Sequence, residues 1–143
     1  MEQGLGREGE DDVVDALVRA AFTTMAVLSK IAADSDLSLT QLRVFGILRD
    51  RRLRMAELAD FLGLEKSTMS GLVDRAEKRG LVRRAPSASD RRAVEVFLTA
   101  DGLQVAERIR QRVGQELSPM TGGLTPAERR RLQGLLERML GGG

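Results

Sequence analysis

The hydrophobic residues of this chain recur mostly at the spacing of helices. From residue 12 to residue 33, apolar side chains return every three or four positions, which predicts a long amphipathic helix. The acidic, glycine-rich stretch before it is expected to be a frayed tail. Ser38 and Gln41 have the spacing of a capping box, in which each side chain bonds the backbone of the other residue. They predict a second helix that ends near Asp50.

Two shorter helices, with a glycine-containing turn between them, come next. The apolar positions predict helices over residues 55–62 and 66–79, and Gly63 and Gly80 stand where these helices should end. In the second helix, the residues expected to face inward share the i, i+3, i+4, i+7 spacing, and they are Met69, Leu72, Val73 and Ala76. Two helices in this order predict a helix-turn-helix.

After Gly80 the pattern changes from helical spacing to alternation. Residues 81–84 are strand-like, the segment PSASDR is rich in turn residues, and residues 93–98 alternate. One side of this last strand carries the apolar residues Val94, Val96 and Leu98. The other side carries Glu95 and Phe97. The pattern predicts a β-hairpin with a polar loop.

Two further helices are predicted after the hairpin. Thr99 can cap a helix that runs to about Leu117, and Pro119 with the glycines after it is expected to break the chain. Thr125 and Glu128 then signal the start of the last helix, which ends at the glycine tail. The apolar residues of these two helices are too many for one small core, so part of them should bury against a partner: Ile109, Val113, Leu117, Leu132, Leu135, Leu136 and Met139.

The predicted fold is a single domain over residues 1–143, mainly α-helical with a small antiparallel β-hairpin wing. Within it, residues 38–98 form a winged helix-turn-helix. No internal repeat or linker interrupts the chain.

Composition narrows the chemistry. The chain contains no Cys and no His. Disulfides and thiol redox chemistry are excluded, and the most frequent general base and metal ligand is missing. We therefore expect no enzyme, no metal site and no cofactor. The aromatic residues are four Phe, without Trp or Tyr, so base-stacking platforms for single-stranded nucleic acid are not expected.

Charge is uneven along the chain. Residues 41–98 carry 13 Arg and Lys against 8 Asp and Glu, a net charge of +5, and the remainder carries 10 against 13, a net charge of −3. A basic centre is typical of a protein that binds a polyanion, although ordinary surface charge gives the same count. The N-terminal stretch does not resemble a secretory signal, and the longest uncharged stretch, residues 20–29, is too short to span a bilayer. We expect a cytoplasmic protein without a membrane segment.

The helix at residues 66–79 and the hairpin loop carry side chains suited to double-stranded DNA. A major groove admits one helix, and small hydroxyl-bearing residues let that helix approach closely. Asp90, Arg91 and Arg92 stand at a loop that can reach the adjacent minor groove, which attracts arginine. Each feature alone also fits an ordinary cap or a solvated turn, but the combination is more specific. The expected DNA-facing residues are Lys66, Ser67, Thr68, Ser70, Gly71, Arg75, Arg91 and Arg92.

Three segments carry a resemblance to a known family. LTQLRVFGILRD, MAELADFLGLEKSTMSGLVDRAEKRGLVRR and SDRRAVEVFLTADG resemble the MarR (multiple antibiotic resistance regulator) family of transcription factors, in the same order over almost the whole chain. The wing signature D-x-R…LT-x-x-G runs here from Asp90 to Gly102.

The resemblance implies a homodimer whose two winged modules straddle a palindromic operator in double-stranded DNA. Residues 12–33 and 99–140 would then be dimerisation helices, which adds Val13 and Leu17 to the expected interface. By the same resemblance, Arg92 enters the minor groove, and Asp90 braces the wing by pairing with an arginine.

Four positions depart from the pattern of the family. Arg54 and Glu65 stand where Ser or Thr often precedes the third and fourth helices, Gly71 stands where Arg is common, and Ala76 replaces a frequent Leu. Glu65 suits the helix dipole but is a poorer cap and repels phosphate. We expect less base reading at position 71 and less core beneath position 76.

The absence of Cys and His disfavours the thiol-based and zinc-based sensing known in branches of the family. Two alternatives remain: a small lipophilic or aromatic effector between the dimerisation helices and the winged module, or no effector. Phe22, Met25 and Phe45 either line such a pocket or belong to the core. We expect a sequence-specific transcriptional regulator, a homodimeric repressor released by an effector. The rival hypothesis is a winged-helix scaffold for protein interaction.

Overall fold

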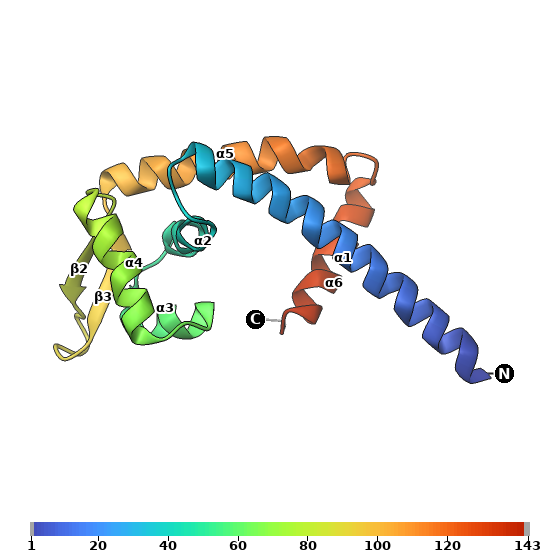
Figure 1. The fold of residues 1–143 in the computed structure, drawn as a ribbon, viewed down its shortest axis with the longest axis horizontal. Helices are drawn as coiled ribbons and strands as arrows, with labels where there is room; N and C mark the ends of the chain where they lie inside the picture. The colour runs from blue at the N-terminus through green and yellow to red at the C-terminus, as the bar shows by residue number, and fades with distance from the viewer. Residues whose placement is uncertain (1, 142–143) are drawn as a thin grey trace.

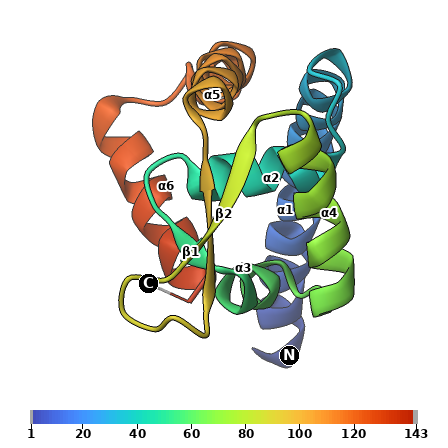
Figure 2. The ribbon, with the colours of Figure 1, turned by 90° about the vertical axis from the view of Figure 1, so that its left-hand side faces the viewer.

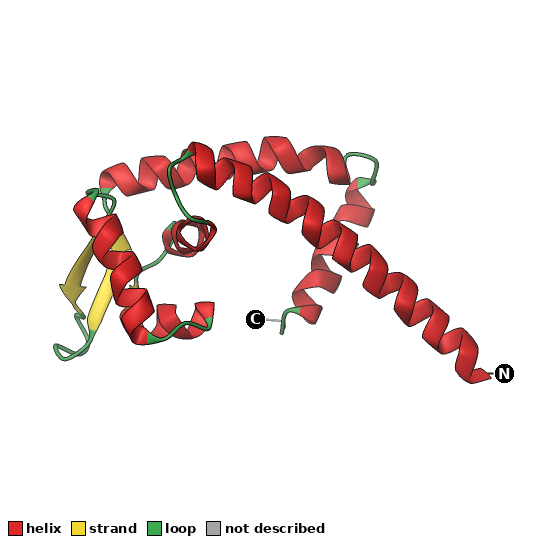
Figure 3. Ribbon diagram, viewed as in Figure 1, coloured by secondary structure: helices red, strands yellow, loops and turns green. Residues whose placement is uncertain are grey.

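The computed structural model of the chain describes the backbone of residues 2–141 and the side chains of residues 9–141. Three helices form an arm: α1 (Glu2–Asp34), α5 (Ala100–Thr121) and α6 (Pro126–Met139). The C-terminal part of α1 packs against α5, while its N-terminal half extends away from the rest of the molecule (Figure 1). Helix α6 folds back from the far end of α5, as Figure 3 also shows.

The winged module is built from the middle of the chain. Its elements in chain order are α2 (Leu39–Leu48), β1 (Leu53–Arg54), α3 (Met55–Leu62), α4 (Lys66–Lys78), β2 (Val82–Pro86) and β3 (Val94–Leu98). The three strands form an antiparallel sheet in the order β1-β3-β2, with Leu53 opposite Val96 and Val82 opposite Leu98. Helices α2, α3 and α4 gather behind and beside this sheet (Figure 2).

The two predicted capping boxes are confirmed. The Gln41 amide donates to Ser38 Oγ at 3.1 Å, and the Ser38 amide donates to Gln41 Oε1 at 2.9 Å. The same reciprocal pair joins Thr125 and Glu128 at the start of α6. The hydrogen bond from the Thr125 amide to the Glu128 carboxylate favours the charged form and lowers the pKa of Glu128. Gly63 ends α3 with a φ of 63°, in the left-handed region that glycine reaches without strain.

The predicted frayed tail is wrong, and the predicted break between the last two helices is confirmed at Gly122 but not at Pro119. The expected frayed tail is helical from Glu2, because extending an existing helix costs much less than starting one and acidic residues are favourable at its N-terminal end. Pro119 lies inside α5, which continues to Thr121 and has Gly122 as its C-cap. Proline cannot donate a hydrogen bond to the carbonyl oxygen of Gln115, but the Ser118 hydroxyl donates to that oxygen at 3.2 Å. The hydroxyl thus satisfies the carbonyl oxygen that the proline leaves without its helical donor.

Strand β1 was not predicted. It has only two residues, and its partner, β3, lies more than forty positions along the chain. A run of this length has no periodicity of its own. The buried side chain of Leu53, opposite Val96, extends the core across the sheet.

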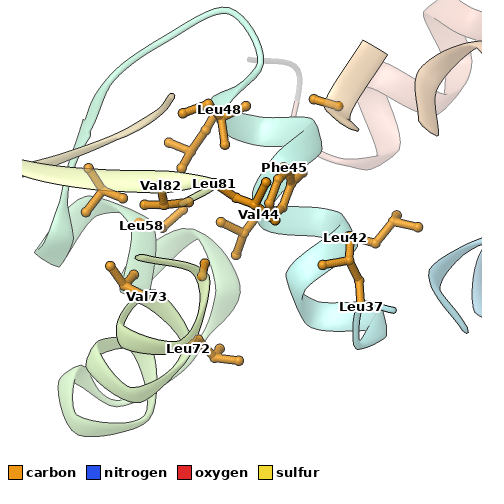
Figure 4. Close-up of a cluster of buried hydrophobic side chains, with 14 of the residues drawn as sticks. Leu37, Leu42, Val44, Phe45, Leu48, Leu58, Leu72, Val73, Leu81 and Val82 are labelled. Carbon is orange, nitrogen blue, oxygen red and sulfur yellow. The ribbon is translucent and has the colours of Figure 1, made fainter. Parts of the chain in front are cut away.

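The core lies where the arm meets the winged module. Side chains from α2, α3, α4 and the sheet meet there, as Figure 4 shows for Phe45, Leu58 and Val73 among others. Ile31 and Ala32 at the end of α1, and Ala106 and Ile109 in α5, complete it. The arm and the module therefore share one core at this end of the molecule.

The start of α5 is closely packed on the turn before β2. The Thr99 hydroxyl donates to the Gly80 carbonyl at 2.6 Å and accepts from the Gly102 amide at 3.0 Å. A Cβ atom placed on Gly102 would lie 2.0 Å from the Leu81 carbonyl oxygen. Only a residue without a side chain fits this contact between helix and turn.

The far ends of the arm leave apolar side chains uncovered in the protomer. Among the described residues, α6 has no buried side chain, and α1 exposes a row of apolar residues: Val13, Val14, Leu17, Val18, Phe22 and Met25. The segment of α1 from Gly9 to Asp34 is long and apolar enough, by length and composition, to cross a membrane. The uncharged stretch at residues 20–29, which is too short to span a bilayer, does not indicate such a segment. The burial of Ile31 and Ala32 in the core ties the end of that segment to the winged module.

Candidate double-stranded DNA interface

Helix α4 buries its apolar side and presents the opposite side to solvent. The predicted inward set of Met69, Leu72, Val73 and Ala76 is buried against α2, α3 and the sheet. Of the predicted DNA-facing residues in this helix, those that are exposed are Lys66, Ser67, Thr68 and Arg75. Ser70 and Gly71 are only half-exposed, so they are less accessible than the sequence suggested.

The two unusual cap residues behave differently. The Arg54 amide, before α3, donates to Glu57 Oε1 at 3.2 Å, so that Glu57 satisfies the helix start. Glu65, before α4, makes no capping hydrogen bond through its side chain. This agrees with its being a poorer cap than Ser or Thr. The start of α4 therefore lacks the side-chain cap that a Ser or Thr would supply.

The wing loop is closed by hydrogen bonds within the loop itself. The Ser87 amide donates to the Ala93 carbonyl at 2.9 Å, and the Ala93 amide donates to the Asp90 carbonyl at 3.0 Å. The Arg92 amide donates to Asp90 Oδ1 at 3.0 Å. Ser87 is buried at the base of the loop. The side chains of Arg91 and Arg92 are exposed at the tip of this closed loop.

The predicted pairing of Asp90 with an arginine is not observed. Among the residues whose side chains are described, no guanidinium forms an ion pair with Asp90. Its carboxylate instead accepts from the backbone amide two residues on, which is the usual local hydrogen bond of an aspartate in a turn. Asp90 thus shapes the loop from within.

Two arginines that the sequence reading missed attach the wing to its surroundings. Arg84 Nη2 donates to Asp74 Oδ1 at 2.5 Å and to the Ser70 carbonyl at 3.1 Å, so β2 is bonded to α4. Arg54 Nη2 donates to Ser89 Oγ at 3.2 Å, which joins β1 to the wing loop. The alternation of β2 contained a signal for Arg84, because a charged residue at a core-facing position needs a partner.

Arginines also connect the arm with the end of α4. Arg79 Nη1 donates to the Asp36 carbonyl, in the turn between α1 and α2, at 2.7 Å. Arg112 of α5 bonds Asp34 at the end of α1 at 2.6 Å, and this hydrogen bond raises the pKa of Arg112. Hydrogen bonds therefore link the end of α4 to the α1–α2 turn, and the end of α1 to α5.

The predicted dimerisation residues fall into two groups. Those that are exposed in the protomer are Val13, Leu17, Leu132, Leu135, Leu136 and Met139. Ile109 differs, because it is buried in the protomer's own core, and Val113 packs partly against that core. Leu117 is half-buried. The stripe in α5 therefore faces the protomer's own core at Ile109, which corrects the prediction for that residue.

An open pocket of about 870 Å³ lies between α1, α2 and the end of α3. Its walls include Met25, Leu42 and Ile47, and its two charged residues are Arg43 and Arg51. Of the three residues considered for a pocket, Met25 lines this one, Phe45 is buried in the core, and Phe22 is exposed. The pocket combines apolar walls with positive charge, and none of the described residues that line it is acidic.

Comparisons with known proteins agree with this architecture. A model of the MarR family matches residues 35–93. The multiple antibiotic resistance protein MarR of Salmonella typhimurium is 31% identical over 116 residues, which cover 80% of this chain and 81% of that protein. The transcriptional repressor NicR of Pseudomonas putida is 30% identical over 129 residues, covering 89% of this chain and 82% of NicR.

A solved structure shows the same likeness. It is that of BpsR from Bordetella bronchiseptica, whose DNA binding is regulated by 6-hydroxynicotinic acid. BpsR is 30% identical to this chain, covers 90% of it with 93% of its own chain, and superimposes with a TM-score of 0.71. These similarities agree with the observed winged helix-turn-helix and three-helix arm. The chain belongs to the MarR family of transcriptional regulators.

Proposed function

We propose that this regulator is a homodimeric repressor that binds a palindromic operator and is released by a small anionic aromatic effector. The observation that carries the proposal is the placement of two DNA-reading elements on one module. The start of α4 and the wing loop lie at the same end of the winged module (Figure 2), and both expose basic side chains. A helix and a basic loop so arranged suit adjacent major and minor grooves.

Repression is proposed by similarity to NicR, which is a transcriptional repressor. Similarity to MarR-family transcriptional regulators also favours DNA binding over a scaffold for protein interaction. The same similarity favours a non-enzymatic role in the cytoplasm.

The homodimer is supported by the uncovered apolar surfaces of the arm. Soluble proteins rarely leave contiguous apolar rows such as those of α1 and α6 in contact with water. A second copy of the chain can cover them through a two-fold interface, in which the same surface meets itself. The predicted dimerisation helices, residues 12–33 and 99–140, contain these rows.

Replacement of Arg92 by alanine tests the wing. If Arg92 enters the minor groove, Arg92→Ala should weaken operator binding by roughly 1–3 kcal/mol and reduce the slope of log K against log salt by about one unit per wing. The dimer should remain folded because Arg92 is exposed and supports no core residue. Fluorescence anisotropy over a series of salt concentrations measures both quantities.

Arg130→Ala is the matched control, because Arg130 is an exposed arginine on α6 and its loss changes the net charge equally. Equal losses of affinity for the two variants would mean that Arg92 contributes only general charge.

The pocket beside α1 is the proposed effector site. Apolar walls with Arg43 and Arg51 suit an aromatic ring that bears a carboxylate, and BpsR is regulated by a molecule of this kind. A panel of aromatic carboxylic acids that includes 6-hydroxynicotinic acid should contain a compound that raises the melting temperature and releases operator DNA. Arg43→Gln should weaken its binding about tenfold, the scale of a lost charged hydrogen bond.

Arg49→Gln serves as the control for this experiment, since Arg49 is the C-cap residue of the same helix, α2, and does not line the pocket. Unchanged binding of the acid to Arg43→Gln would place the effector elsewhere.

A further inference from the structure

Arg84 occupies an unusual position in the wing. It lies on β2 opposite Val96, and its neighbour two residues before, Val82, is buried on the same side of the sheet. The side chain of Arg84 is 28% exposed and its Nε atom is buried without a hydrogen-bond partner among the described residues. A charge in such a place destabilises the fold unless partners hold it.

Its partners both belong to α4. Nη2 reaches Asp74 Oδ1 at 2.5 Å and the Ser70 carbonyl oxygen at 3.1 Å, and these two residues are one helical turn apart. The guanidinium is planar and fixed at its Nε end by burial, so it constrains direction as well as distance. Strand β2 is thereby bonded to the middle of α4, next to the proposed DNA-facing residues Ser70, Gly71 and Arg75.

We infer that Arg84 and Asp74 are positioning residues for operator recognition. They fix the wing against α4, and so fix the spacing between Arg92 at the wing tip and the start of α4. A protein that reads two adjacent grooves at once needs that spacing to match the DNA. The inference rests on the proposed recognition of an operator, and it assigns specificity to a pair of residues that need not touch DNA.

The sign of one substitution separates this role from simple electrostatics. Asp74 is a half-exposed carboxylate on α4, with a side-chain exposure of 51%. Removing a negative charge near DNA should tighten binding if charge alone matters. If Asp74 holds the wing in place, its loss should weaken binding to the operator despite the gain in charge.

The test uses the full-length protein and two duplexes: one selected for binding from a random library, and a shuffled duplex of the same composition. Asp74→Asn and Arg84→Gln should each weaken binding to the selected duplex about tenfold, the scale of coupled contacts. Binding to the shuffled duplex should stay unchanged or become slightly tighter for Asp74→Asn. The double variant should lose no more than the single ones, because both remove the same bond.

Glu77→Gln is the matched control, because it removes one negative charge from the exposed side of α4 and Glu77 forms no ion pair among the described side chains. It should bind the selected duplex at least as tightly as the wild type. Tighter binding of the selected duplex by Asp74→Asn, additive losses, or equal losses on both duplexes would overturn the inference. So would a lowered melting temperature with unchanged discrimination. A wild-type protein that does not discriminate between the duplexes would instead overturn the proposed function itself.

Discussion

Replacement of Leu136 by aspartate is expected to convert the dimer into monomers and to weaken operator binding by about 100-fold or more. Leu136 lies on α6, which has no buried residue in the described protomer, so the protomer alone can accept a charge there. At a dimer interface the same charge would be buried without a partner. Analytical ultracentrifugation and DNA titration measure the two effects.

Gly134→Asp provides the control for this variant. Gly134 lies on the same helix, and a Cβ atom added to it would meet nothing within 4 Å in the protomer. Counted at the helical spacing from Leu136, it falls on the opposite face of α6. The control should remain dimeric and bind the operator normally. A Leu136→Asp protein that remains dimeric and binds the operator with normal affinity would show that α6 is not part of the interface.

Gly102→Ala is expected to destabilise the protein by about 1–3 kcal/mol, as overpacking of a well-packed site does. The added Cβ would lie 2.0 Å from the Leu81 carbonyl oxygen and 3.3 Å from Leu98 Cβ. The carbonyl cannot move freely because it accepts a hydrogen bond from the Thr99 amide at 3.0 Å. Chemical denaturation at a fixed protein concentration measures the change in the free energy of unfolding.

Gly114→Ala is the control on the same helix, since a Cβ atom there meets nothing within 4 Å. Alanine favours helix over glycine by about 1 kcal/mol, so this variant should be more stable than the wild type. If Gly102→Ala is also more stable, the close contact between α5 and the turn before β2 has no energetic consequence.

The elements that sequence reading predicted well are those specified locally. The bounds of α3, its glycine end at Gly63 and the capping box at Thr125 depend on residues within four positions of one another. The buried side of α4 followed from helical spacing alone. Such features are fixed by backbone preference and amphipathic pattern, which a single sequence contains in full.

The features that sequence reading missed depend on partners distant in sequence, or on a side chain that takes over a backbone hydrogen bond. Strand β1 exists because Leu53 meets Val96, and Arg84 is understood only when Asp74 and Ser70 are beside it. Pro119 does not end its helix, and the neighbouring Ser118 hydroxyl bonds the carbonyl oxygen that the proline leaves without a donor.

The periodicity of α5 was clear, but periodicity identifies an apolar face without identifying what covers it. For that reason Ile109 was placed at a dimer interface when it belongs to the protomer core. The same ambiguity applies in reverse to Phe22, which is exposed in the protomer although it was expected in a pocket or a core.

The measurement that tests the account most directly is a selection of duplex DNA from a random library by the purified wild-type protein, followed by sequencing. Two winged modules related by two-fold symmetry should enrich an inverted repeat, with half-site centres about 10 base pairs or a multiple apart. Enrichment should disappear for Leu136→Asp. Repeated rounds that yield no enriched motif, or a single motif without an inverted repeat, would contradict a symmetric dimer that reads an operator.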